Sequence, residues 1–181
     1  QRSRYACVVV FLRLLAVLAV AAFSHSLFAA TVTQSNITYT YTVGVATAAV
    51  SGHSSASGAI TIPSTITVDG ATYNVTSILG GVDFFVGWAG FQGNSTITSV
   101  TISSGVTSIA AYAFASCINL ASVTFPSSLT SIGNGAFRGC TSLLSVTIPD
   151  SVTYLGEAFQ NCTNLASVTL PSGLTSLAGY N

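Results

Sequence analysis

The chain has 181 residues, of which 50% are hydrophobic and only 4% are charged, and its formal net charge at pH 7 is +0. This length suits one domain, and the high apolar content excludes an intrinsically disordered chain. Nucleic acids and anionic membrane surfaces select for clustered Lys and Arg, which this chain lacks, so we expect neither as a partner.

Residues 1–30 differ from the rest of the chain. Arg2 and Arg4 precede a long apolar run, and small residues are frequent toward the end of the segment. A basic start, an apolar centre and a small-residue end predict a secretory signal peptide. We expect cleavage between Ser26 and Ala30.

A membrane anchor is the alternative for this segment. The apolar run from 8 to 23 is shorter than the ~20 residues that a spanning helix needs, and Arg13 within it would cost about 2.5–3.5 kcal/mol near the bilayer centre. A signal peptide is therefore favoured, and no membrane insertion is expected of the mature domain. That domain carries one base, Arg138, against four acids, so it would be mildly acidic.

Residues 31–58 predict an N-terminal β cap and a loop. The segment Ile37–Val43 alternates in strand fashion, Gly44 ends it, and a second extended run follows. A two-strand cap would cover the open strand edge and the apolar end of the repeats behind it. The Gly- and Ser-rich stretch 52–58 predicts a flexible loop in which His53 is solvated.

Residues 59–181 predict a series of repeats that begins with a degenerate copy. Ile60–Pro63 and Val75–Ile78 resemble the two extended segments of later copies. The stretch between them is an extension, and its Asp69-Gly70 pair predicts a tight turn.

An insertion near residues 79–90 interrupts this first repeat. Thirteen positions separate Ile78 from Phe91, whereas five separate the corresponding residues of later copies. Because insertions in solenoids form surface loops, the aromatic residues here could form an exposed anchor for a partner: Phe84, Phe85 and Trp88. The favoured alternative is that these rings cover the apolar gap between the cap and the first full repeat.

From residue 97 onward one unit recurs almost unchanged, and its valine stands 22 or 23 positions apart in successive copies. Each unit predicts a strand, a turn, a second short extended segment and a short helical turn. Burying one Phe or Leu contributes roughly 1.5–3 kcal/mol, whereas ordering one residue's backbone costs about 1–2 kcal/mol, so one unit cannot fold alone. A stacked solenoid of ~23-residue repeats is predicted. Its last repeat is truncated, which indicates a fragment.

The pattern LxSVTxPxxLTSIxxxAFxxCxxL, from Leu120 to Leu143, resembles the BspA-type leucine-rich repeats of secreted and surface proteins. The match is strong over 97–181 and looser over 60–100. The resemblance implies a right-handed solenoid, an α/β repeat fold that is predominantly β, with one strand of each repeat lining one face. It also implies a secreted or cell-surface location and frequent roles in adhesion to host or matrix proteins.

The strand face is the second candidate for partner binding. Because side chains alternate along a strand, the Ser and Thr of each SVT motif should point outward and form two columns. The result would be a flat, uncharged hydroxyl surface, which is the common binding face of leucine-rich repeats as the resemblance implies. It could equally be soluble filler, and such an array also resembles the ice-binding faces of some β-solenoids. The residues are Ser99, Thr101, Ser122, Thr124, Ser145, Thr147, Ser167 and Thr169.

Three cysteines occupy one column of the repeat, and Asn94 takes the same place in the first copy. Neighbouring layers are close enough for a disulfide, but an odd trio cannot pair completely, and a free thiol is a good small core residue. We predict buried free thiols at Cys117, Cys140 and Cys162. A metal site is not expected, since one thiol per layer does not converge with other ligands.

Catalysis has little support in this sequence. His53 would be the only histidine of the mature chain, the acids are scattered singly, and the stretch 52–58 misses the GxSxG nucleophile motif. No phosphate-binding loop, calcium loop or HExxH helix is present, so we expect neither an enzyme nor a cofactor.

The sequence therefore predicts an exported, non-enzymatic leucine-rich-repeat protein that presents a surface for protein–protein binding or for cell and matrix adhesion. Its expected partner is an extracellular or host/matrix protein. The alternative is a structural spacer or stalk that carries a domain missing from this fragment, because the outward positions of the repeats are chemically bland.

Overall fold

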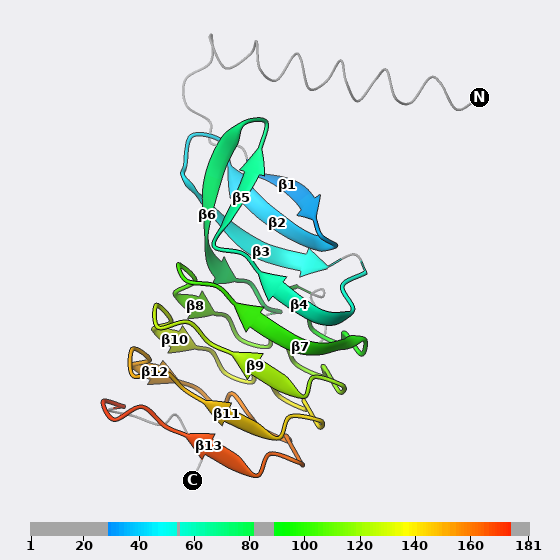
Figure 1. Ribbon diagram of the computed structural model, residues 1–181, viewed down its shortest axis with the longest axis vertical. Helices are drawn as coiled ribbons and strands as arrows, with labels where there is room; N and C mark the ends of the chain where they lie inside the picture. The colour runs from blue at the N-terminus through cyan, green and yellow to red at the C-terminus, as the bar shows by residue number, and fades with distance from the viewer. Residues whose placement is uncertain (1–28, 54, 82–88, 175–181) are drawn as a thin grey trace, which may run out of the picture.

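A computed structural model describes residues 29–53, 55–81 and 89–174. Figure 1 shows its strands in successive layers, from the amino-terminal strands at the top to the last repeat at the bottom. The predicted signal peptide lies outside the described residues except for Ala29 and Ala30, which open the first strand. The strands are β1 (Ala29–Gln34), β2 (Ile37–Thr42), β3 (Thr47–His53), β4 (Gly58–Ile62), β5 (Thr65–Val68), β6 (Ala71–Ile78), β7 (Ile97–Ile102), β8 (Ser108–Ile109), β9 (Ser122–Thr124), β10 (Ser131–Ile132), β11 (Ser145–Thr147), β12 (Tyr154–Leu155) and β13 (Ser167–Thr169).

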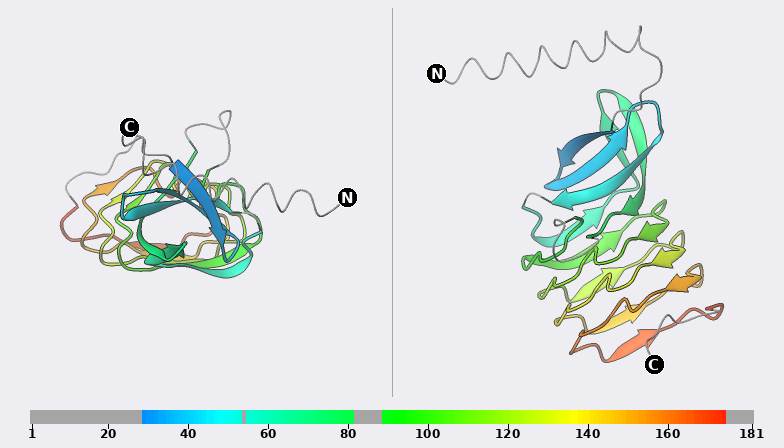
Figure 2. Two further views of the ribbon diagram at one scale, coloured as in Figure 1. Left: turned by 90° about the horizontal axis from the view of Figure 1, so that it is seen from above. Right: turned by 180° about the vertical axis from the view of Figure 1, so that it is seen from behind.

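One sheet runs the length of the described structure, in the order β1-β2-β3-β6-β8-β10-β12, with β5 paired to β6. Its first three strands are antiparallel to one another, and from β3 onward the neighbours in this order are parallel. The other side of the layers carries the parallel strands β4-β7-β9 and, separately, β11-β13. Each repeat thus places one strand on each side of the layers. Figure 2 shows these layers from above and from behind.

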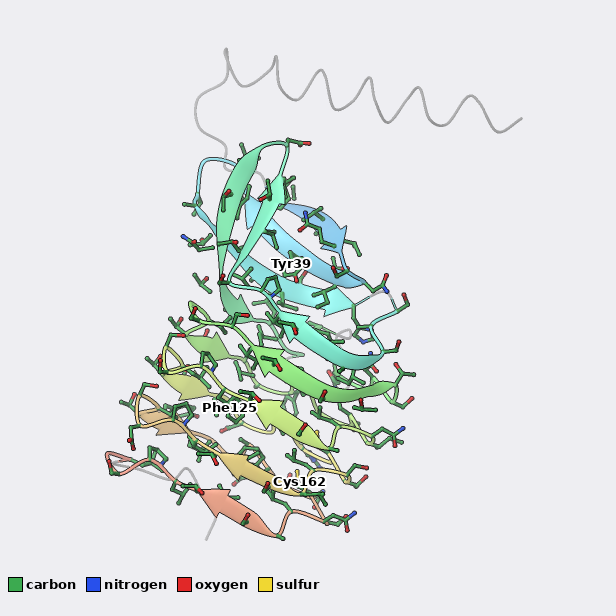
Figure 3. All side chains as sticks on the ribbon, in the orientation of Figure 1. Tyr39, Phe125 and Cys162 are labelled. Atoms are coloured by element: carbon green, nitrogen blue, oxygen red, sulfur yellow. The ribbon has the colours of Figure 1, made fainter. Side chains whose placement is uncertain are left out.

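The interior between the two sides is filled by residues that recur once per layer. Phe91, Phe114, Phe137 and Phe159 form a ladder of stacked rings, with successive centroids 5.0, 5.1 and 5.4 Å apart. Aliphatic side chains line the rest of this core, and it continues into the amino-terminal strands, where Tyr39 is buried (Figure 3). Stacking therefore removes from water the apolar face that one repeat cannot bury alone.

The structure corrects the helical part of the predicted α/β class, because the described residues contain strands and turns but no helix. The segments expected to be helical turns have residues in the left-handed region: Tyr112 and Ser116 at φ 59° and 60°, and Gly135 and Gly139 at φ 60° and 71°. An α-helix needs negative φ at every residue, so two such positions four apart prevent one. Helical spacing of the apolar residues was misleading here.

The amino-terminal segment also differs from the prediction. It has three strands instead of two, because Ser35 and Asn36, at φ 50° and 62°, form a two-residue hairpin turn between β1 and β2. The predicted Asp69-Gly70 turn is confirmed, since both residues have positive φ and join β5 to β6. The loop predicted for 52–58 is partly wrong, because β3 extends through His53 and β4 begins at Gly58.

Candidate functional site

The hydroxyl side chains of the SVT motifs align in columns across paired strands. Ser99 and Thr101 of β7 pair in register with Ser122 and Thr124 of β9, and the same two columns continue from β11 to β13. In β9 the outward Ser and Thr are exposed while Val123 between them is partly buried, which is the alternation that the sequence predicts. Their role in binding remains a prediction.

The expected continuous hydroxyl surface is interrupted between β9 and β11. The two strands lie next to each other but are not joined in one sheet, since β9 ends the sheet β4-β7-β9 and β11 begins another. A groove of about 380 Å³ is lined by residues of both strands; we call it the strand groove, and its lining residues are Ser122, Val123, Thr124, Phe125, Ser145, Val146, Thr147 and Pro149. Four of the eight predicted hydroxyl residues therefore line one concave feature.

The sheet is interrupted next to Phe125, which is the largest side chain found at its position in the repeat. Ile62 and Ile102 are register partners in β4 and β7, and the next repeat carries Phe125 in their place (Figure 3). Its ring packs edge-on against Phe137 at a centroid distance of 5.7 Å and 74°. A phenyl ring needs more room between layers than an Ile side chain, and it stands at the layer where β9 and β11 do not pair.

The chemistry of the strand groove is that of neutral hydrogen bonding. Its lining contains no ionisable side chain, so the Ser and Thr hydroxyls have no adjacent base to activate them as nucleophiles. Facing edges of β9 and β11 add backbone N–H and C=O groups that do not pair with each other. Val123 and Phe125, both partly buried, supply apolar surface to its lining. The groove is suited to binding through neutral hydrogen bonds and apolar contact.

The three cysteines are free and buried, as predicted. Each thiol donates to a carbonyl oxygen of the preceding layer: Cys117 to Phe91 at 3.1 Å, Cys140 to Phe114 at 3.2 Å and Cys162 to Phe137 at 3.1 Å. Hydrogen bonding with the Cys117 thiol, together with burial, raises the pKa of Cys140, and burial raises the pKa of Cys162 to about 11. Cys140 and Cys162 therefore stay protonated at neutral pH, and all three cysteines are buried core residues.

Asn94, which takes the place of a cysteine in the first copy, ties the amino-terminal strands to the repeats. Its Oδ1 accepts hydrogen bonds from the backbone N–H groups of Thr96 at 2.8 Å and Ile97 at 3.0 Å. Its Nδ2 donates to the carbonyl oxygen of Ala56 at 2.9 Å and to Nδ1 of His53 at 3.2 Å. The appearance of Asn in a cysteine column was the sequence signal for this contact.

His53 is not the solvated loop residue that the sequence predicted. It ends β3, and its ring stacks on Phe91 at a centroid distance of 5.6 Å and an angle of 2°, so that it extends the Phe ladder by one ring. Burial lowers its pKa from the usual 6.5, because the charged imidazolium would lose hydration. Sequence reasoning missed this because the ladder partner lies 38 positions away.

The remaining predicted contacts, Phe84, Phe85 and Trp88, lie outside the described residues. Within the part of the chain that the structure describes, no group of three or more His, Cys, Asp or Glu residues is placed to hold a metal ion. The same residues include no helix of a length and apolarity that would cross a membrane.

Comparisons with known proteins point to one family. The family model described as "BspA type Leucine rich repeat region" matches residues 86–181 in 6 copies. A search of curated proteins gave no match.

Three solved bacterial structures share the fold. A leucine-rich repeat protein from Bacteroides capillosus is 27% identical, with a TM-score of 0.59 over 82% of this chain and 96% of its own. A leucine rich cell surface protein from Faecalibacterium prausnitzii is 26% identical, with a TM-score of 0.57 over 82% of this chain and 44% of its own. A leucine-rich repeat protein from Bacteroides ovatus is 30% identical, with a TM-score of 0.52 over 77% of this chain and 41% of its own. This chain therefore spans less than half the length of the last two.

Proposed function

Because the chain belongs to the BspA-type leucine-rich repeat family, we propose that it is an exported, non-enzymatic protein that binds an extracellular or host/matrix protein through its strand face. The strand groove between β9 and β11 is the observation that carries this proposal. It is the place on this face where hydroxyl side chains, apolar surface and uncommitted backbone edges meet.

The groove's composition favours a protein partner. Protein interfaces combine an apolar centre with a rim of neutral hydrogen bonds, and here Val123 and Phe125 would supply the centre while Thr124 and Thr147 would supply part of the rim. The absence of charge in this lining favours a partner surface that is itself uncharged, because an unpaired charge would lose hydration on docking.

The architecture that presents this face is proposed to be a right-handed solenoid of ~23-residue repeats with β1–β3 as its amino-terminal cap. The register supports the repeat length, since Thr130 donates to Thr107, 23 positions earlier. The cap assignment is supported by β3, which pairs with β6 and so covers a strand edge that would otherwise be open.

A secreted or cell-surface location is consistent with this proposal. The family and the cell surface protein of Faecalibacterium prausnitzii both point to such a site. The predicted signal peptide would deliver the chain there. Cleavage before Ala29 would leave β1 whole, whereas cleavage after Ala30 would remove its first two residues.

The test is saturable binding of the folded chain to immobilised extracellular-matrix proteins and to whole cells. The variant Thr124→Glu with Thr147→Glu places two charges in the groove, and we expect binding to fall at least about tenfold because carboxylates would lose hydration at the interface. A matched control, Ser127→Glu with Thr163→Glu, adds the same charge at exposed residues outside the groove and should bind as the parent does.

Equal loss in both double variants would show a net-charge effect and contradict the groove as the contact. Absence of binding by the folded parent would contradict the binding proposal and favour the spacer. A third variant, with Phe84, Phe85 and Trp88 changed to Ala, tests the separate prediction that the insertion is an adhesive anchor.

A further inference from the structure

The carboxyl end of β3 lies where the amino-terminal strands meet the first repeat (Figure 1), and a second concave site is lined by residues at this junction. We call it the junction cleft; its volume is about 330 Å³ and its lining residues are Gly52, His53, Gly90, Gln92 and Gly93. That volume is at the small end of the range for ligand pockets, which is about 300–1,000 Å³. The cleft shares no residue with the strand groove.

The hydrogen-bond network of Asn94 fixes which nitrogen of His53 carries the proton. Two backbone N–H groups point at one atom of the Asn94 amide, so this atom must be the oxygen, and the other atom is the NH₂ donor. That NH₂ group faces His53 Nδ1 at 3.2 Å. Nδ1 must therefore accept, and in the neutral imidazole the proton lies on Nε2, which is a donor.

Gln92 contributes an acceptor that has no partner. Its side chain is 6% exposed, and its Oε1 is buried without a hydrogen bond. A buried carbonyl oxygen without a donor is unfavourable, and native structures contain few of them. The repeat does not require this residue, because Ala115 occupies the equivalent position of the next copy, and Gln160, three copies after Gln92, is exposed.

We propose that the junction cleft binds a neutral amide group, with His53 Nε2–H donating to the amide oxygen and Gln92 Oε1 accepting from the amide N–H. An amide offers one acceptor and one donor in a single planar group, side by side in a primary amide and on opposite sides in a trans peptide unit, and this pair calls for one of each. A charged ligand is disfavoured, because the lining holds no side chain that is charged at neutral pH. The amide can come from a peptide backbone or from an Asn or Gln side chain.

The experiment is a titration of the ¹⁵N-labelled chain by nuclear magnetic resonance with N-methylacetamide, acetamide and methyl acetate. The first two probes represent the backbone and the side-chain amide, and the ester has a similar shape but no N–H donor. We expect both amides to shift the resonances of Gly52, His53 and Gly93 saturably. The ester should bind at least about tenfold more weakly, because it leaves Gln92 Oε1 unpaired.

Variants separate the role of Gln92 from general packing. Gln92→Leu should weaken amide binding about tenfold while leaving the weak affinity for the ester unchanged, and Gln92→Ala, which copies the next repeat, should do the same if Leu disturbs the fold. Gln160→Leu changes the equivalent exposed residue and should bind amides as the parent does.

Tighter binding of N-methylacetamide than of acetamide would identify backbone peptide units as the source of the amide, and the reverse would identify Asn or Gln side chains.

Three results would overturn the proposal. These are the absence of saturable shifts with either amide, equal affinity for the ester, and undiminished amide binding in both Gln92 variants. Each is independent of the matrix and cell binding assay, because the strand groove stays intact in these variants.

Discussion

The thiol of Cys140 donates a hydrogen bond across 3.2 Å to the carbonyl oxygen of Phe114, a residue of the preceding layer. Cys117 and Cys162 repeat this contact at the corresponding positions. The carbonyl oxygens of Phe91, Phe114 and Phe137 also accept backbone N–H groups from Asn94, Cys117 and Cys140 respectively. The cysteine column therefore adds a second hydrogen bond, between layers, to carbonyl groups that are already paired.

The reactivity of the buried thiols should depend on whether the chain is folded. A thiol with a pKa of about 11, as burial gives Cys162, is a thiolate in about one molecule in a thousand at pH 8. We expect Cys117, Cys140 and Cys162 to resist alkylation by iodoacetamide in the folded chain and to react once guanidinium unfolds it. The measurement is mass spectrometry of the Cys7→Ser variant; rapid labelling of all three thiols in the folded chain would contradict this prediction.

Stability should fall at alkaline pH. Burial raises the pKa of Cys162 from 9.0 to about 11 and that of Tyr39 from 10.0 to about 12, so the folded chain binds more protons than the unfolded chain in these windows. The stabilisation is complete below pH 9 and is lost as the pH rises toward 11 and 12. Urea unfolding at a series of pH values measures it. Tyr39→Phe should flatten the part of the profile above pH 10, and an unchanged profile would argue against this assignment.

His53 should titrate below its usual value. Because burial lowers its pKa from 6.5, the folded chain binds fewer protons, and its stabilisation is present above pH 6.5 and lost as the pH falls. Protonation at Nδ1 would also remove the acceptor for Asn94. Ring resonances followed against pH should give a midpoint below 6.5. His53→Phe, which keeps a ring at this end of the ladder, should remove the acid-dependent loss; a midpoint at or above 6.5 would refute the prediction.

The middle of the Phe ladder should matter most for stability. Phe114 is fully buried and stacks on Phe91 and Phe137, so Phe114→Ala should lower the free energy of unfolding by about 3–5 kcal/mol through lost burial and a cavity. Phe159→Ala is the matched comparison, because that ring is only partly buried and should cost less. Urea unfolding gives both values, and equal losses would show that ladder position is irrelevant.

Phe125 should control the strand groove. If its bulk separates β9 from β11, Phe125→Ile, which restores the aliphatic residue found in β7, should let the two strands pair. Hydrogen exchange of the β9 and β11 amides should then slow, because ladder hydrogen bonds protect them. Ile102→Val, at the corresponding position of the preceding repeat, is the control and should leave exchange there unchanged. Unaltered exchange in Phe125→Ile would assign the break to another cause.

Much of the repeat fold could be predicted from periodicity alone, because each position of the unit meets the same kind of neighbour in every layer. The outward Ser122 and Thr124 and the buried Cys140 follow from this rule. The helical turn did not, since the Phe and Cys positions repeat at helical spacing but φ at Tyr112 and Ser116 has the opposite sign. Sequence spacing reports which residues are buried and not how the backbone turns between them.

The candidate sites lie where residues depart from the repeat pattern, and at these positions the sequence predicted less of the structure. A single Phe in an aliphatic column lines the strand groove, and Gln92 and Asn94 depart from the Ala and Cys of the next copy. Sequence alone shows each substitution. It does not show that Asn94 reaches back to His53, because that contact joins residues 41 positions apart across two different modules.

The sequence by itself determined the family, the stacking of repeats and the buried columns, because these depend on a local pattern that recurs in every layer. Only the tertiary structure decided the separation of β9 from β11, the state of His53 and the unpaired oxygen of Gln92. These features depend on side-chain volumes and on hydrogen-bond partners that lie far apart in the sequence. Such residues come into contact only when the layers pack.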